Sequence, residues 1–498
     1  MQEIKPKPPA SAGQLFGHPK GLFLLFGTEM WERLSYYGMR GIFVFYLTST
    51  AAAAVFGWGQ LSDTELQSKA LSYLGWYAML VYLTPIIGGW MADNRWGQRR
   101  CIMFGGTLMM LGQFSLGFPH AWLPDGSQIY MLWLGLALLI IGNGFFKPNI
   151  STMVGDLYEE GDKRRDTAFT IFYMGINLGS ILGYLVVGWI GEKVDYQLAF
   201  IVAGIGMLLG LLLQMTQARR YLGQIGIQPS AHLGLEQGSN GATDKHRPLT
   251  QEERDRIKVI LVLGVFIVVF WAGFEQAAGS MNLFAKYRTD LNVLGWEIPA
   301  SWLQMVNPLF IIILAPIIAS IWVGMGDREP SSPAKFSLGL VFLGIGFLSM
   351  CGAALQIGDS ETIKASIWWL VFAYIFHTIG ELCLSPIGLS VVTKLSPLRY
   401  LSLMMGLWFA FIGIANKGAA EIGKLVGVSG PLATFGGVAL AAIVAGFILY
   451  LIREKLVDWM HGAEEVHVTV GETTKEEISI TADHEGTPPR HFSGNQKE

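Results

Sequence analysis

The segment GTEMWERLSYYGMRGIF (27–43) places two acids, two arginines and two tyrosines inside an otherwise apolar stretch. At 100° per residue of an α-helix, four of these side chains fall within one narrow stripe and two lie on its flanks. The stripe comprises Glu29, Arg33, Tyr36 and Arg40, and its flanks carry Glu32 and Tyr37. Acids that exchange protons and arginines that hold an anion are therefore predicted to share one helix face. The alternative is a set of internal ion pairs that only holds helices together.

Further ionisable residues interrupt other apolar runs. Lys147 ends the run IIGNGFFK, Glu275 lies in VVFWAGFEQ and Glu381 lies in YIFHTIGELCLSPIG. A charge inside a membrane span costs at least about 2.5 kcal/mol, so each residue is a functional candidate. The alternatives are a snorkelling lysine at a boundary and structural hydrogen bonds for the acids. His377 and Ser385 share a helix face with Glu381, and the histidine is either a packing residue or a proton carrier.

These charges differ between the two halves of the chain. The buried cations Arg33, Arg40 and Lys147 precede the middle of the sequence, and the buried acids Glu275 and Glu381 follow it. A zwitterion fits between a cationic and an acidic wall. The same opposite charges could pair when a cleft closes, and protonation of an acid would then release its cationic partner.

Aromatic and amide side chains complete the candidate pocket. Each aromatic residue is also compatible with simple packing at a helix contact or a membrane interface. The set consists of Tyr36, Tyr37, Tyr82, Asn177, Trp271, Asn307 and Trp408.

Composition predicts a membrane protein. Of 498 residues, 52% are hydrophobic and only 15% are charged, which is unusual for a soluble protein of this length. The net charge of -3 provides no basic field for nucleic acid. Cys101, Cys351 and Cys383 fall in or beside apolar segments and predict neither a disulfide framework nor a metal site.

The apolar stretches predict about twelve transmembrane helices in two sets of six. Lys and Arg concentrate in the loops on one side, so both termini are predicted to be cytoplasmic. The predicted fold class is an all-α polytopic protein of two six-helix bundles, a multi-pass protein of the cell inner membrane. Its predicted regions are a cytosolic N-terminus (1–20), an N-terminal bundle (21–216), a cytosolic linker (217–256), a C-terminal bundle (257–454) and a disordered cytosolic tail (455–498).

The motif EMWER at 29–33, followed by YYGMR at 36–40, resembles the ExxER signature of the proton-coupled oligopeptide transporter family, a branch of the major facilitator superfamily. Similar matches occur in both halves, so the resemblance spans nearly the whole core. They are GGWMADNRWGQRR (88–100), FFKPNIST (145–152), FYMGINLGS (172–180), FWAGFEQ (270–276), NPLF (307–310) and GELCLSPIG (380–388).

The resemblance implies a major facilitator fold that imports di- and tripeptides with protons by alternating access, driven by the proton gradient without a cofactor. Its implied partners are peptides, protons and membrane lipid, with no nucleic acid and no obligate protein partner. Implied proton-coupling residues are Glu29, Glu32, Arg33, Glu275 and Glu381. Implied peptide contacts are Arg40 and Lys147 at the carboxylate, Glu381, Asn177 and Asn307 at the amino end, and Tyr36, Tyr37, Tyr82, Trp271 and Trp408 along the side chains. Ser385 and Glu275 complete the binding set, and Arg40–Glu275 and Lys147–Glu381 are the implied closing ion pairs.

The chain departs from some members of this family in two ways. Its linker is too polar to form the two additional helices that many bacterial members carry between the halves, and its QIGDSETIKAS loop is too short for the large extracellular domain of animal members. Another solute, such as nitrate or a glycosylated or drug-like compound, is the main alternative. An enzyme is disfavoured because the sequence contains no motif for metal, nucleophilic or phosphate chemistry. A channel is disfavoured because opposite charges split between two halves suit a closing cleft, and a sensor without transport stays open.

Overall fold

The computed structural model describes residues 13–124, 126–159, 162, 164–229, 248–358, 360, 362–397 and 400–463. Most of the predicted N-terminal segment, the middle of the predicted linker and most of the predicted tail lie outside these residues. Helices make up nearly all of the regular structure within them. Two short antiparallel hairpins are the exceptions among the described elements: β1 (Gln14–Leu15) with β2 (His18–Pro19), and β3 (Asn292–Val293) with β4 (Trp296–Glu297).

The first half of the chain forms one group of helices, with α1 packed against α7, α9 and the π-helical turn η4. Two π-helical turns, η2 and η4, continue directly from helices of this half. The elements are α1 (Lys20–Leu47), α2 (Thr50–Val55), α3 (Asp63–Leu83), α4 (Pro85–Met91), η2 (Ala92–Trp96), α5 (Gln98–Leu116), η3 (His120–Trp122), α6 (Gln128–Asp156), α7 (Arg164–Leu182), η4 (Gly183–Gly188), α8 (Trp189–Lys193) and α9 (Tyr196–Leu222).

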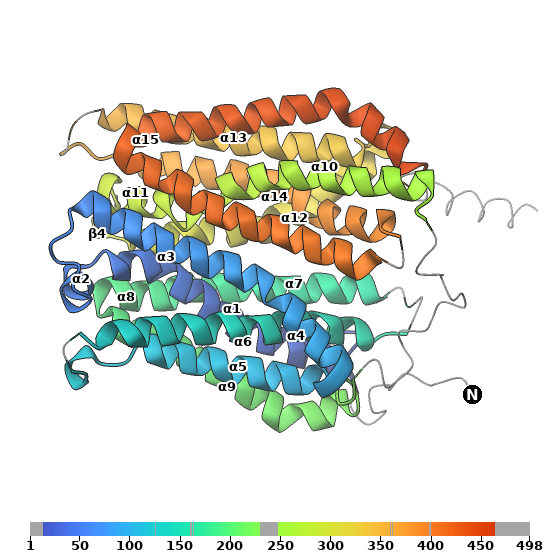
Figure 1. Cartoon of the computed structure of the whole chain (residues 1–498), viewed down its shortest axis with the longest axis horizontal. Coiled ribbons are helices and arrows are strands. Elements are labelled where there is room, and N and C mark those ends of the chain that lie inside the picture. The colour runs from blue at the N-terminus through green and yellow to red at the C-terminus, as the bar shows by residue number, and fades with distance from the viewer. Residues whose placement is uncertain are drawn as a thin grey trace, which may run out of the picture.

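The second half forms the other group, in which α15 packs along α10 and α13 and also along α3 of the first half. Its elements are α10 (Gln251–Phe274), η7 (Glu275–Ala277), α11 (Ser280–Arg288), η8 (Ala300–Met305), α12 (Val306–Met325), η9 (Gly326–Arg328), α13 (Ser332–Ile357), α14 (Ile367–Leu395) and α15 (Leu401–Met460). In Figure 1 the two groups lie one above the other, with their helices along the long axis.

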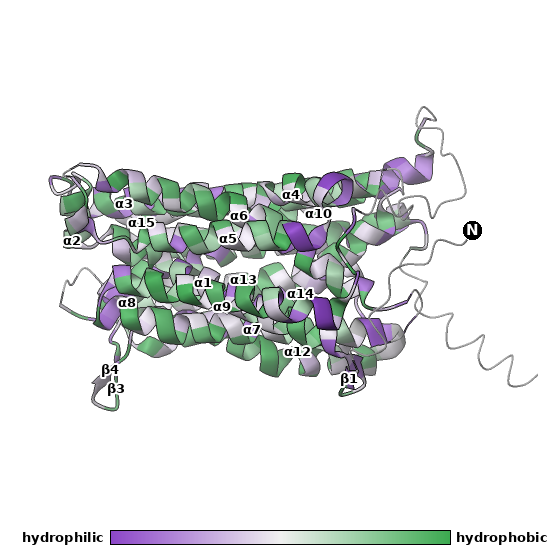
Figure 2. Ribbon diagram, turned by 90° about the horizontal axis from the view of Figure 1, so that it is seen from below, coloured by the Kyte–Doolittle hydropathy of each residue, from purple (hydrophilic) through white to green (hydrophobic). Residues whose placement is uncertain are grey.

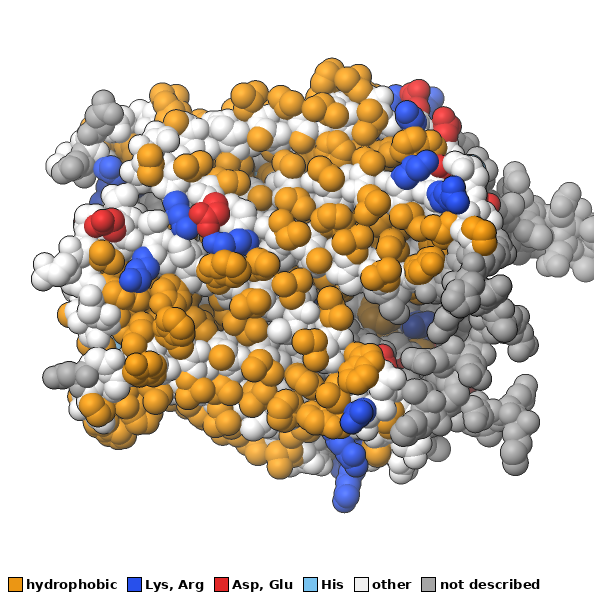
Figure 3. All heavy atoms as spheres, in the orientation of Figure 1, with side chains coloured by type: hydrophobic (Ala, Val, Ile, Leu, Met, Phe, Trp, Pro, Cys, Tyr) orange, Lys and Arg blue, Asp and Glu red, His pale blue; other side chains and the backbone are white. Residues whose placement is uncertain are grey.

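Nine helical segments within the described residues are long and apolar enough to cross a membrane. The segment α1 is not among them, because four charged side chains interrupt it between Glu29 and Arg40. The segment α15 counts once although it covers two predicted spans, which are separated by a left-handed φ of 80° at Gly430. Apolar residues cover the middle of the molecule, and charges gather toward its ends (Figures 2 and 3). The protein is thus a multi-pass membrane protein, and the number of about twelve spans stays a prediction.

Predicted boundaries at both ends of the linker and at the start of the tail differ from the helix ends. The helix α9 continues to Leu222 and α10 begins at Gln251, so both extend into the predicted linker. A reciprocal capping box between Thr250 and Glu253 explains the early start of α10, because it satisfies backbone N–H groups at the helix end. The prediction that disorder starts at residue 455 is wrong for 455–460. These residues are the last turns of α15, where Leu456 and Met460 are buried.

Gly88 marks a close approach of α4 to α6, the helix that carries Lys147. A Cβ at position 88 would lie 2.0 Å from the carbonyl oxygen of Gly144. We expect Gly88→Ala to destabilise the protein by about 1–3 kcal/mol, because the two backbones must separate. The measurement is the melting temperature of the purified protein. Gly437→Ala is the control, since no heavy atom lies within 4 Å of its added Cβ, and equal melting temperatures would contradict the prediction.

Candidate functional site

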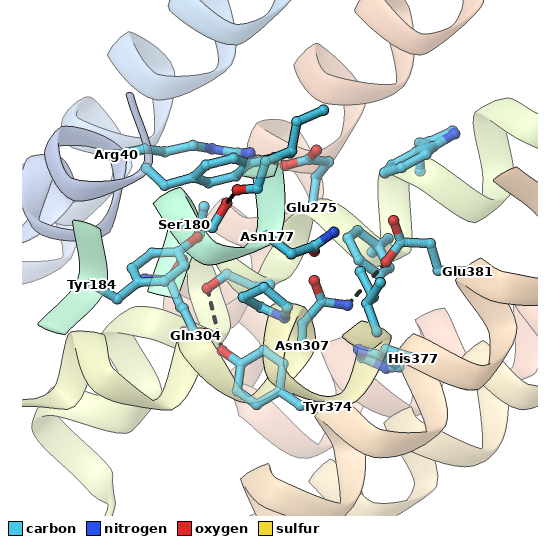
Figure 4. Close-up of a pocket in the computed structure, with 18 of the residues that line it drawn as sticks. Arg40, Asn177, Ser180, Tyr184, Glu275, Gln304, Asn307, Tyr374, His377 and Glu381 are labelled. Carbon is cyan, nitrogen blue, oxygen red and sulfur yellow. Dashed lines mark hydrogen bonds and ion pairs between the residues drawn. The ribbon is translucent and has the colours of Figure 1, made fainter. Parts of the chain in front are cut away.

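A cavity of about 150 Å³ lies between the two groups of helices. The first half contributes residues from α1, α3, α7 and η4, and the second half contributes residues from α10, η7, η8, α12 and α14 (Figure 4). Its lining residues are Tyr37, Arg40, Tyr82, Tyr173, Ile176, Asn177, Ser180, Tyr184, Trp271, Phe274, Glu275, Ala277, Ala278, Gln304, Asn307, Pro308, Ile311, Tyr374, His377 and Glu381. Residues predicted for the site in the first half of the chain and in the second half therefore line the same cavity.

An ion pair between Arg40 and Glu275 crosses the cavity from one half to the other. Arg40 lies in the second half of α1, and Glu275 lies where α10 gives way to the 3-10 turn η7. Both side chains are buried, with 8% and 7% of their residue surfaces exposed. In this structure, the pair therefore joins the halves on the side of the cavity toward the end of α1.

Glu381 forms the opposite part of the cavity wall. The Asn307 side-chain nitrogen donates to the Glu381 carboxylate at 2.9 Å and to the Thr378 hydroxyl at 3.0 Å. Tyr374, His377 and Glu381 recur at helical spacing along α14, so all three reach the cavity. Among the described residues no Lys or Arg forms an ion pair with Glu381. Its carboxylate is therefore available to a cation that enters the cavity.

His377 lies beside this carboxylate in an aromatic environment. Its ring centroid is 4.7 Å from that of Phe347 and 6.4 Å from that of Phe274. The geometry places His377 in the cavity wall.

The acids and the arginine of the ExxER motif form a separate buried cluster next to the cavity. The Nε atom of Arg33 lies 2.8 Å from a Glu29 carboxylate oxygen and 2.6 Å from a Glu32 carboxylate oxygen. All three residues are at most 3% exposed. The Arg33 guanidinium lies 6.0 Å from the ring centroid of Tyr37, which does line the cavity. One arginine thus contacts two buried carboxylates, and the three formal charges sum to one negative charge when both acids are ionised.

Lys147 lies behind the cavity wall. Its ammonium group is 4.8 Å from the ring centroid of Tyr82, a lining residue. Lys147 does not line the cavity, and it forms no ion pair with Glu381 or another described acid. The implied Lys147–Glu381 pair is therefore open in this structure, whereas the Arg40–Glu275 pair is closed.

Three other predicted residues also lie outside the cavity lining. Tyr36 packs against the rings of Tyr37 and Tyr77, with centroids 5.1 and 6.4 Å away. Trp408 is 1% exposed and packs in the second half against Phe336 and the backbone at Gly388. The Ser385 hydroxyl is buried without a hydrogen-bond partner among the described residues. Side-chain type alone did not separate these packing positions from pocket positions.

Several lining residues were missed from the sequence although a spacing signal was present. Tyr173, Ser180 and Tyr184 lie four before, three after and seven after Asn177, so they recur near one helix face. The same rule relates Gln304 to Asn307 and Tyr374 to Glu381. Inspecting the positions one or two helical turns before and after each predicted site residue would have found them.

The chain matches the family model described as the POT family over residues 99–231 and 239–429. It is 36% identical over 489 residues to an uncharacterized transporter of Bacillus subtilis (strain 168), an alignment that covers 90% of this chain and 96% of the relative. It is 34% identical over 496 residues to a di-/tripeptide transporter of Lactococcus lactis subsp. cremoris, covering 89% of this chain and 97% of the relative.

A crystal structure of a peptide transporter POT in complex with sulfate is also similar. The TM-score is 0.80 at 37% identity, covering 91% of this chain and 98% of the other. The family consists of transporters and not of enzymes, and the predicted major facilitator architecture agrees with this likeness. The chain therefore belongs to the POT family.

Proposed function

We propose that this protein imports di- and tripeptides together with protons, driven by the proton gradient across the cell inner membrane. The observation that carries the proposal is the cavity between the halves, with Arg40 in one wall and Glu381 in the other, where no Lys or Arg of the described residues forms an ion pair with Glu381. A peptide has an ammonium group at one end and a carboxylate at the other, and both ends then find an opposite charge. The named function of the Lactococcus lactis relative supports the same substrate class.

The amino end of the peptide is assigned to Glu381 and Asn307. Their carboxylate and amide oxygens accept hydrogen bonds from an ammonium group. A nitrate ion would not use such a wall, so the alternative of another small anion is not supported by the arrangement.

The carboxylate end of the peptide is assigned to Lys147 and Arg40. Lys147 has no ion-pair partner among the described residues, and its ammonium group lies 4.8 Å from the ring centroid of Tyr82, which lines the cavity. Arg40 is engaged with Glu275 in this state, so it becomes available when that pair loosens.

Alternating access provides the transport step. The cavity of about 150 Å³ is smaller than common ligand pockets of about 300–1,000 Å³, so loading requires the halves to separate further. In this structure the Arg40–Glu275 pair is closed and the Lys147–Glu381 pair is open. This combination suits a state in which the cavity opens toward the end of the molecule where α1 begins. Exchange of these two pairs would open the opposite side.

The test is uptake of labelled dialanine into liposomes that contain the purified protein, with an acidic exterior. We expect accumulation that collapses when a proton ionophore is added. Protein-free liposomes are the control for leakage, and N-acetyl-dialanine amide is the control solute, because it has neither charged end. If the protein neither accumulates nor exchanges dialanine, the peptide assignment is wrong, and nitrate and other small solutes become the substrates to screen.

A further inference from the structure

A carboxylate of the first half holds the start of a helix in the second half. Glu192, in the short helix α8, accepts hydrogen bonds from the backbone N–H groups of Ala300 and Ser301 at 3.0 and 2.9 Å. It also accepts one from the Ser301 hydroxyl at 2.5 Å. We call this contact the Glu192 clasp.

The clasp replaces a cap that the helix lacks. The residue before η8 is Pro299, which makes no side-chain capping hydrogen bond. Ala300 and Ser301 are fully buried, so their N–H groups would otherwise be unsatisfied away from water, which is costly. A carboxylate is also favoured at the positive end of a helix dipole. A charge from the other half of the molecule thus completes this helix start.

The helix start that Glu192 holds leads directly into the cavity wall. The turn η8 contains Gln304 and continues into α12, which begins with Val306 and Asn307. Gln304 and Asn307 line the cavity, and Asn307 donates to Glu381. Glu192 itself does not line the cavity, so it acts on the site only through the position of this helix.

The clasp lies among other contacts that join the halves at the end of the molecule where α1 finishes. The Trp302 indole donates to the Leu185 carbonyl at 3.2 Å, and the Asn282 amide donates to the Gly41 carbonyl at 2.9 Å. These are single hydrogen bonds between uncharged groups, whereas the Arg40–Glu275 pair and the 2.8 Å hydrogen bond from the Lys286 ammonium to the Tyr196 hydroxyl are charged contacts between the halves toward the same end. The clasp combines an ionised acceptor with three donors, and such bonds are roughly twice as strong as neutral ones.

We propose that Glu192 is a positioning residue of the transport cycle, whose clasp holds this end closed and must release each time the cavity opens there. The proposal rests on the alternating access assigned above. It makes the same contact responsible for two things: closure of one exit, and placement of Asn307 against Glu381 while that exit is closed.

The test measures how fast a cavity position is labelled from outside intact cells by a membrane-impermeant maleimide. The reporter is Ser180→Cys, at a lining position, in a background where Cys101, Cys351 and Cys383 are replaced by alanine. Leu294→Cys, at a fully exposed hairpin, establishes whether the clasp end faces outward. If it faces inward, the same measurement is made in inside-out vesicles.

We expect Glu192→Ala to raise the labelling rate of the reporter about tenfold or more, since three hydrogen bonds to a charged group are lost. Glu192→Gln should give a smaller rise, because the amide oxygen still accepts hydrogen bonds. The matched control is Glu297→Gln, which removes a pair with Lys193 that also joins the halves at this end. That pair is 3.5 Å long and exposed, so its loss should change the rate less than twofold.

An unchanged labelling rate in a folded Glu192→Ala variant would overturn the proposal. A lower melting temperature without faster labelling would identify a purely structural contact and would overturn it as well. If Glu192→Ala does not fold, Glu192→Gln is judged by the same criterion. Labelling needs no peptide, so a failure of the dialanine experiment and a failure of the clasp are distinguishable.

Discussion

Replacing Glu32 by glutamine is expected to abolish proton-driven accumulation of dialanine and to leave exchange of dialanine across the membrane within a few-fold of wild type. In the structure, Arg33 contacts the carboxylates of both Glu29 and Glu32, so the two buried acids share one ion-pair partner among the described residues. Glu29 receives a hydrogen bond from Arg33, whereas neither oxygen of Glu32 has a hydrogen-bond partner among the described residues. A proton on Glu32 would neutralise the cluster.

Glutamine at position 32 mimics the protonated acid, so the variant no longer needs the proton that wild type takes up. For one proton per peptide, a difference of one pH unit should drive about tenfold accumulation in wild type and none in the variant. The measurement is the steady-state ratio of labelled dialanine inside and outside liposomes, together with counterflow at equal pH. Glu454→Gln is the control, because this acid is 81% exposed in its pair with Arg453.

Accumulation at the wild-type ratio by Glu32→Gln would show that the coupling proton binds elsewhere. The double variant Glu29→Gln/Glu32→Gln provides a second comparison. It leaves Arg33 buried without a carboxylate partner, and removal of buried charge partners destabilises proteins by roughly 3–5 kcal/mol. We therefore expect the double variant, but not the single one, to lose much of its folded population.

Replacing Glu381 by glutamine is expected to weaken dialanine binding by about 30-fold to more than 1,000-fold. The expected loss corresponds to roughly 2–5 kcal/mol for one partner of a buried, hydrogen-bonded charge pair. Asn307 holds the Glu381 carboxylate at 2.9 Å, and no described cation competes for it. The measurement is the dissociation constant of dialanine for the purified protein.

N-acetyl-dialanine provides the matched comparison on the side of the ligand, because acetylation removes the ammonium charge. Wild type should bind it weakly, and Glu381→Gln should bind it about as weakly as wild type does. The two losses should therefore not add, as is usual for groups in direct contact. If Glu381→Gln still prefers free dialanine as strongly as wild type, Glu381 does not hold the amino end.

Local sequence patterns predicted the features that depend on one helix at a time. The stripe from Glu29 to Arg40 follows from the helical repeat, and the same repeat places His377 and Glu381 on one face of α14. The apolar runs predicted membrane helices because lipid requires each span to satisfy its own backbone. The motifs predicted the family, which the comparisons confirm.

Only the tertiary structure decided which of these residues meet. Trp408 and Tyr184 are both aromatic residues of buried segments, but packing turns Trp408 toward Phe336 and Tyr184 toward the cavity. The Arg40–Glu275 pair is closed and Lys147–Glu381 is open, because ion pairs between the halves depend on how the halves pack against each other in this structure. The Glu192 clasp joins positions more than a hundred residues apart along the chain, and no local periodicity relates them. Helical repeats fix which face a side chain occupies, whereas the partner of that face is set by the packing of the two halves against each other.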